Sequence, residues 1–197
     1  MFERALNLGP WSLVVAAAVA GCSLQQPAPA PQVAARARPR PVPPASSAPA
    51  EIVSDCGISK LRETVLVQVN AMRAAARSCG PRKMPAVRAL AWNKALAEAA
   101  EQHSVDMVAR RYFDHVSPDG RHVSQRVAAQ GYKWRAVGEN LAGGDTTVNG
   151  VLAGWLKSPD HCQNIMNPAF SDVGVSCVRQ GGSKWGTYWT MVLAAHR

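Results

Sequence analysis

The sequence lacks the charge patterns that mark a nucleic-acid-binding protein. Its 197 residues carry a formal net charge of +9, yet they contain no run of five or more like charges and no nucleic-acid motif. Internal repeats are also absent. The scattered basic residues therefore indicate a solvated basic surface rather than a nucleic-acid footprint. Such a surface would favour an anionic cell envelope.

Two motifs that carry metal or catalytic chemistry are missing as well. No pair of cysteines has the C-x-x-C spacing, and no serine lies in a G-x-S-x-G segment. The first absence argues against a metal site of four thiolates. The second removes the nucleophile elbow that is typical of α/β-hydrolases.

The longest apolar run near the start is too short to span a bilayer as a mature helix. It covers residues 11–20, follows Arg4 and leads through Ala-Gly into Cys22. Small residues before a cysteine are typical of bacterial lipoprotein signals. We predict a signal peptide over residues 1–21 and a lipid anchor on Cys22, with an ordinary cleaved signal or an uncleaved anchor as alternatives. Ser23 would accompany outer-membrane sorting in a Gram-negative host.

Residues 22–50 are rich in proline and alanine and show no apolar period. Such composition favours an extended chain with polyproline II character. We predict a linker that holds one folded domain, residues 51–197, away from the membrane.

Apolar residues recur every three or four positions in much of this domain, which predicts amphipathic helices. The expected helices cover 58–76, 93–111, 122–130 and 148–155. Asn93 is the expected cap of the second helix, and His103 falls on its apolar side, as a buried, hydrogen-bonded histidine would. Ser158-Pro159 is expected to end the last helix, and irregular chain is expected over 164–168.

Alternation with a period of two predicts strands at the end of the chain, over 173–178 and 186–195. Residues 132–144 are expected to be extended or irregular. Helices first and strands late favour an α+β fold over a doubly wound parallel sheet.

The chain has five cysteines, and lipidation of Cys22 would account for the odd one. The other four allow three pairings, and an oxidising compartment would let them form. Two cysteines bracket the first helix and two bracket one short segment, so we predict the disulfides Cys56–Cys79 and Cys162–Cys177.

Three polar stretches carry most of the candidate chemistry: 113–120, 137–144 and 158–162. The second contains Glu139 and Asn140 among three glycines, which allow tight turns and close backbone approach. We predict that the three stretches meet in space and form a polar cleft. The candidate cleft residues are His115, Ser117, Glu139 and His161.

A series of short motifs resembles the bacterial branch of the CAP superfamily, or SCP domain, which includes cysteine-rich secretory proteins, insect antigen 5 and plant pathogenesis-related proteins. The motifs occur in this order: Leu90-Ala91-Trp92-Asn93, His103-Ser104-x-Asp106-Met107, Phe113-x-His115-x-Ser117-Pro118-Asp119-Gly120, Gly138-Glu139-Asn140-Leu141-Ala142, Trp155-x-x-Ser158-Pro159-x-His161-Cys162-x-Asn164-Ile165-Met166-Asn167-Pro168 and Tyr188-Trp189-Thr190. The resemblance covers about residues 58–196. It implies a three-layer α-β-α sandwich with helices on both sides of a small, mostly antiparallel sheet.

The resemblance also implies a cavity, because many eukaryotic members carry two histidines and two glutamates that can bind a divalent metal. His115 matches the first histidine, and Glu139 matches the glutamate of the Gly-Glu-Asn motif. The second glutamate falls at Ser158 and the second histidine at Thr187 or Tyr188, so half of this tetrad is missing.

His161 could replace the missing histidine. Two histidines and a carboxylate match a zinc site with an open position, which makes His115, Glu139 and His161 candidate zinc ligands. The alternative is structural: His115 bonds within its own loop or pairs with Glu139, and Glu139 satisfies backbone N–H groups of its own turn.

Three functions stay open, since fold alone does not fix function. The first is a binding module at the cell envelope, lipid-anchored at the outer membrane or cell surface, or secreted, with an envelope component or a host factor as partner. The second is a metal-dependent or serine-type hydrolase of envelope peptide or glycan, with Ser117, His115 and Glu139 as an imaginable triad. The third is a structural or host-contact module. Relatives are proposed as proteases and as lipid or sterol binders.

Overall fold

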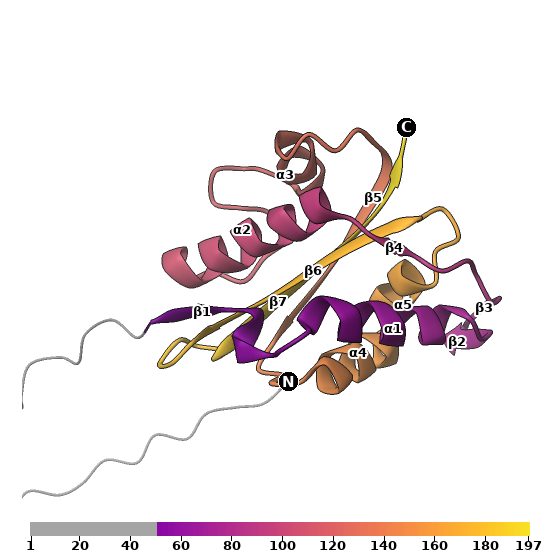
Figure 1. The fold of residues 1–197 in the computed structure, drawn as a ribbon, viewed down its shortest axis with the longest axis horizontal. Helices are drawn as coiled ribbons and strands as arrows, with labels where there is room; N and C mark the ends of the chain where they lie inside the picture. Colours follow the sequence, from indigo (N-terminus) through magenta and orange to yellow (C-terminus); the bar gives the residue numbers. More distant parts are fainter. Residues whose placement is uncertain (1–50) are drawn as a thin grey trace, which may run out of the picture. The chain divides into compact units, whose positions relative to one another are not determined.

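The computed structural model describes residues 51–197 (Figure 1). The predicted signal peptide 1–21, the lipidated Cys22 and the linker 22–50 lie outside the described residues. Within the described domain, none of the helices combines the length and apolar character that a membrane crossing requires.

The described domain contains five α-helices, one short 3-10 helix and seven strands. The helices are η1 (Asp55–Gly57), α1 (Leu61–Arg73), α2 (Lys94–Arg110), α3 (Val123–Ala129), α4 (Val148–Lys157) and α5 (Pro159–Ile165). The strands are β1 (Ile52–Ser54), β2 (Arg77–Cys79), β3 (Arg82–Met84), β4 (Ala91–Trp92), β5 (Trp134–Gly143), β6 (Asp172–Gln180) and β7 (Thr187–His196).

The main sheet has the order β1-β6-β7-β5, and the short strand β4 pairs with β6 as well. Only the β4–β6 pair is parallel; the other pairs of this sheet are antiparallel. β2 and β3 form a separate hairpin. Helices α2 and α3 cover one face of the sheet, and α1, α4 and α5 cover the other (Figure 1). The predicted α+β fold, a three-layer α-β-α sandwich, is thus confirmed.

One glycine sets how closely α2 approaches the sheet. Gly174 of β6 lies directly beneath the α2 backbone, and a Cβ at this position would overlap the main chain at Leu96 and Ala97. The helix begins as the sequence predicts, because Asn93 Oδ1 accepts a hydrogen bond from the Leu96 N–H at 3.3 Å.

The prediction of irregular chain over 164–168 is wrong in part, because residues 164–165 belong to helix α5. Ser158 does end α4, but Pro159 begins α5 directly afterwards, since a proline needs no hydrogen-bonded N–H in the first helical turn. Residues 132–144, expected to be extended or irregular, are mostly extended, because ten of them form the strand β5. Both elements turn out to carry the candidate site.

The predicted disulfides Cys56–Cys79 and Cys162–Cys177 are also wrong. The structure instead joins Cys56 to Cys177 and Cys79 to Cys162, each with a Cα–Cα distance of 5.3 Å. The 13-residue helix α1 separates Cys56 from Cys79, and a helix of that length is about 20 Å long. A disulfide bridges Cα atoms no more than about 7 Å apart, so α1 keeps its two flanking cysteines from pairing.

Candidate functional site

The candidate site is built around β5, which is hydrogen-bonded to β7 on one side only and so forms an edge of the sheet. Side chains along a strand point alternately to its two faces. Glu139 faces the layer of α2 and α3, where it meets Arg126 of α3. Asn140 faces the opposite layer, where it meets α5.

Side chains from α4 and α5 cover the outer edge of β5. Trp155 Nε1 donates to the carbonyl of Leu141 at 2.9 Å, and Asn164 Nδ2 donates to the carbonyl of Glu139 at 3.2 Å. Asn140 Nδ2 in turn donates to the carbonyl of His161 at 3.0 Å. Unpaired backbone N–H and C=O groups at a sheet edge can otherwise hydrogen-bond to a strand of another chain. Several motif residues therefore close the sheet edge and position the start of α5.

Glu139 is the centre of the polar group. Its side chain is only 2% exposed, and each carboxylate oxygen has its own cationic or polar partner. Arg126 Nη2 donates to Oε2 at 2.6 Å, and His115 Nδ1 lies 2.8 Å from Oε1. The predicted pairing of His115 with Glu139 is thus confirmed.

Arg126 is the residue that the sequence analysis missed. Its guanidinium pairs with Glu139 and also donates to the carbonyls of His115 at 3.0 Å and Arg121 at 2.8 Å. The loop that carries His115 is therefore fastened to α3. The sequence does contain a signal for this role, because Arg126 is a basic residue next to Val127 on the apolar side of a short predicted helix.

Ser117 is not placed as a nucleophile. The residue is buried, and its hydroxyl accepts a hydrogen bond from Arg126 Nη1 at 3.3 Å. The side chain of Ser117 therefore helps to fasten the loop to α3, which is the structural role expected of a satisfied buried hydroxyl.

His115 is the accessible member of the group. Its side chain is 55% exposed, and its Nδ1 is engaged by Glu139, so Nε2 is the ring atom left for a ligand. The hydrogen bond to the Glu139 carboxylate raises the pKa of His115, and burial opposes this effect. The ring is thus held in one orientation and kept readily protonated.

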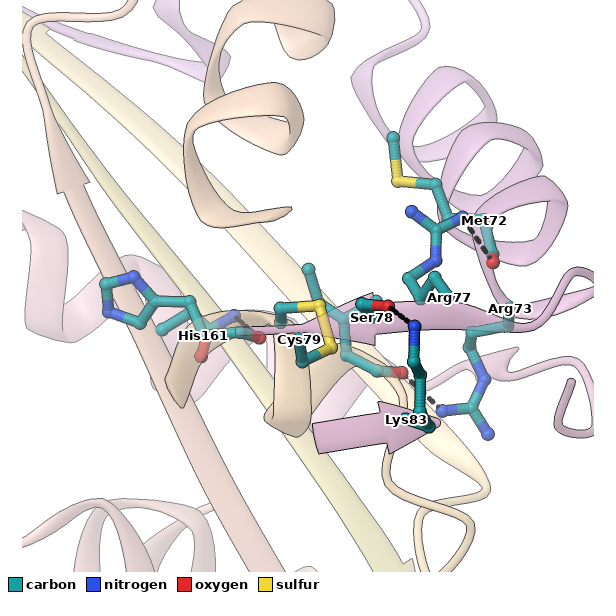
Figure 2. Close-up of a disulfide and its surroundings, with 10 residues drawn as sticks. Met72, Arg73, Arg77, Ser78, Cys79, Lys83 and His161 are labelled. Carbon is teal, nitrogen blue, oxygen red and sulfur yellow. Dashed lines mark hydrogen bonds between the residues drawn. A yellow bond between two sulfur atoms is a disulfide. The ribbon is translucent and has the colours of Figure 1, made fainter. Parts of the chain in front are cut away.

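His161 lies close enough to His115 for the two charges to interact. Burial lowers the pKa of His161, and the charge on His115 lowers it further. The neighbouring Cys162 is bonded to Cys79, which joins α5 to the β2–β3 hairpin, and the His161 ring extends away from this disulfide (Figure 2). The three polar stretches of the sequence therefore meet at the edge strand.

The predicted zinc ligands do not fit a metal site of three protein ligands. Among residues 51–197, no group of three or more histidine, cysteine, aspartate or glutamate side chains is arranged to hold a metal ion. Both oxygens of Glu139 are already taken by Arg126 and His115. Thr187, one of the two tetrad positions in β7, donates its hydroxyl to the carbonyl of Asp145 instead.

His103 has the structural role predicted for it. The residue is buried, its Nε2 lies 2.9 Å from the carbonyl of Asp114, and its Nδ1 lies 3.3 Å from the hydroxyl of Tyr112. Burial lowers the pKa of His103. This histidine supports the chain segment that precedes His115.

An α-β-α sandwich with a covered edge strand, and a buried Glu139–Arg126 pair that holds the exposed His115, define the class of protein. The chain belongs to the cysteine-rich secretory protein family (CAP), whose model matches residues 66–193, more than half of the chain. The family resemblance seen in the sequence is thus confirmed.

Known relatives and solved structures agree with this assignment. The chain is 34% identical over 104 residues to the uncharacterized protein YkwD of Bacillus subtilis (strain 168), which covers 53% of this chain and 40% of that protein. It is 31% identical over 91 residues to the uncharacterized membrane protein YlbC of the same organism, which covers 46% of this chain and 26% of that protein. The chain therefore spans less than half the length of these relatives.

Two solved structures share the fold. One is an extracellular protein containing a SCP domain from Bacillus anthracis str. Ames, with a TM-score of 0.55, 25% identity and coverage of 67% of this chain and 39% of that chain. The other is an outer surface protein from Borrelia burgdorferi, with a TM-score of 0.60, 15% identity and coverage of 75% of this chain and 99% of that chain.

Proposed function

We propose that this chain is an exported CAP domain that binds a ligand or partner at the bacterial cell envelope without converting it. One observation carries the proposal. Both carboxylate oxygens of Glu139 bind internal partners, Arg126 and His115, and this holds the half-exposed imidazole of His115 in place at the surface. A side chain fixed in this way is pre-organised for binding, which lowers the entropic cost of holding a ligand.

Two features support export. Disulfides such as Cys56–Cys177 and Cys79–Cys162 form in oxidising compartments. The similar Bacillus anthracis protein is extracellular, and the similar Borrelia burgdorferi protein is an outer surface protein. Lipidation of Cys22 would tether the domain to the membrane through the linker 22–50, where an envelope component or host factor is within reach.

The proposal is tested by measuring how purified protein, expressed from the full-length gene, binds to isolated cell-envelope fragments. His115→Ala should weaken binding, while His196→Ala, which removes an exposed histidine elsewhere, should leave it unchanged. Both variants should keep the thermal midpoint of the folded domain to within a few degrees. Equal binding by wild type and a folded His115→Ala protein would remove His115 from the ligand-binding surface.

A hydrolase of envelope peptide or glycan is the second candidate, because a carboxylate that orients a histidine is the arrangement of a general base. Here His115 would act on water, since Ser117 is buried against Arg126. Release of soluble fragments from peptidoglycan, with a pH dependence that disappears in His115→Ala, would favour this candidate over binding alone.

A further inference from the structure

Two exposed aromatic rings lie side by side on the surface. Over residues 51–197, the large hydrophobic side chains that are exposed number four: Ile52, Val67, Phe113 and Trp185. The rings of Phe113 and Trp185 contact each other, with centroids 5.3 Å apart and planes inclined by 45°, although they come from loops far apart in sequence. Contiguous exposed apolar surface can serve as a binding site.

The rest of the fold holds both rings in place. Trp185 lies against Gly143 of β5 so closely that a Cβ at Gly143 would stand 3.0 Å from the Cβ and Cγ atoms of the tryptophan. Phe113 also packs against Tyr188, with ring centroids 6.2 Å apart. Rings held in this way lose little conformational freedom when a ligand binds.

The aromatic pair lies on the same side of the sheet as the His115–Glu139 pair. Glu139 and Gly143 are four residues apart in β5, so they face the same layer and are separated by about 13 Å along the strand. Phe113 also precedes His115 by only two residues. A ligand of extended shape can therefore contact the rings and the imidazole together.

We propose that Trp185, Phe113 and His115 form one binding surface for a glycan. The apolar C–H face of a pyranose ring would stack on Trp185 beside Phe113, and a hydroxyl or acetamido group further along would hydrogen-bond to His115 Nε2. The Lys184 ammonium lies over the Trp185 ring, 5.1 Å from its centre, so it would swing off this face as the sugar stacks and would then donate to the polar rim of the sugar. This inference rests on the proposed function and names its ligand class.

The size and surroundings of the surface favour a sugar over other ligands. Two rings offer far less area than the roughly 800 Å² per partner of a stable protein interface. A charged group, Lys184, adjoins Trp185, and His115 lies further along the same face, which suits a ligand with an apolar face and a polar rim. An acyl chain would leave those polar groups without partners.

The probe for the test is tetra-N-acetylchitotetraose, titrated into protein expressed from the full-length gene and followed by NMR and calorimetry. Wild type should bind saturably. Trp185→Leu keeps an apolar contact with Gly143 but has no aromatic face, so binding should fall about tenfold. Trp185→Phe should stay within about threefold of wild type, and His115→Ala should weaken binding. Val67→Ala, on the exposed side of α1, is the matched control and should change nothing.

Envelope-fragment binding separates this inference from the proposed function. Loss of both chitotetraose and envelope binding in Trp185→Leu, with recovery in Trp185→Phe, supports the glycan surface. Envelope binding that depends on His115 but is unchanged in Trp185→Leu overturns the glycan surface and leaves the proposed function standing. A wild-type protein that binds neither chitotetraose nor soluble peptidoglycan fragments also overturns it.

Discussion

At the scale of single residues, Glu139 and Arg126 form a buried ion pair whose side chains are 2% and 5% exposed. A buried pair contributes little beyond its desolvation cost, but removing one partner leaves an uncompensated charge in the interior. The second oxygen of Glu139 then fixes His115. The orientation of the exposed His115 ring thus depends on the buried ion pair between Glu139 and Arg126.

Arg126→Met should destabilise the domain by about 3–5 kcal/mol. The substitution leaves the buried Glu139 carboxylate without its cationic partner, and it removes the hydrogen bonds to the carbonyls of His115 and Arg121. Urea unfolding measures the change. The control is Arg135→Met, which removes an exposed arginine that donates to the carbonyl of His196. A cost no larger than that of the control would contradict the role assigned to Arg126.

The pH dependence of stability should show the His115–Glu139 hydrogen bond. Because the folded-state pKa of His115 is raised above 6.5, its contribution is fully present below pH 6.5 and is lost as the pH rises through the folded-state value. The difference in unfolding free energy between wild type and His115→Gln should therefore shrink from about pH 5 to pH 9.

His103 and His161 act in the opposite direction, since their pKa values are lowered and protonation below pH 6.5 opposes folding. Comparing wild type with His115→Gln cancels the contribution of His103, and making the same comparison in a His161→Gln background removes that of His161, whose pKa the charge on His115 lowers. NMR titration of His115 in Glu139→Gln should show its pKa falling toward the ordinary value. A difference between wild type and His115→Gln that grows with pH would refute the assignment.

At the scale of elements, β5 and α5 position the site together. The strand supplies Glu139 and Asn140, and α5 returns along the edge with His161 and Asn164. The disulfide from Cys162 ties α5 to the β2–β3 hairpin (Figure 2). This tie keeps the covering helix on the sheet edge while the opposite layer holds His115.

Cys162→Ala should leave one free thiol, at Cys79, and Cys177 should stay bonded to Cys56. Losing the bridge should cost about 2–5 kcal/mol, because the unfolded chain is no longer constrained by a long closed loop. Thiol labelling followed by peptide mass mapping identifies the free cysteine. A label on Cys177 would show that the pairing differs from the structure.

At the scale of the whole molecule, one sheet with helices on both faces carries a polar group at its edge and two surface aromatic rings nearby. The proposed anchor at Cys22 and the linker 22–50 would place this domain at the envelope surface. The +9 net charge suits an anionic envelope.

Cys22→Ser should release the protein from the membrane fraction, because the substituted residue cannot be lipidated. Fractionation followed by immunoblotting measures the release, and Cys56→Ser, which affects only a disulfide of the folded domain, is the control. Membrane retention of Cys22→Ser equal to that of wild type would rule out the lipid anchor.

The sequence by itself determined the features that depend on local periodicity. The apolar spacing predicted α1, α2, α3 and α4, and alternation predicted β6 and β7, because a helix or strand must turn its apolar residues toward one core. The motif order predicted the CAP fold, and the Gly-Glu-Asn and His115 motifs predicted the pair that the structure confirms.

Only the tertiary structure decided which distant groups became neighbours. β5 lacks a simple alternation because its two faces contact different helix layers, and α5 begins at a proline that resembles a stop signal. The length of α1 separates Cys56 from Cys79, the packing of β6 and α5 supplies their actual partners, and the role of Arg126 follows from the packing of α3 on β5. Each of these depends on contacts between segments far apart in sequence, which no local pattern specifies.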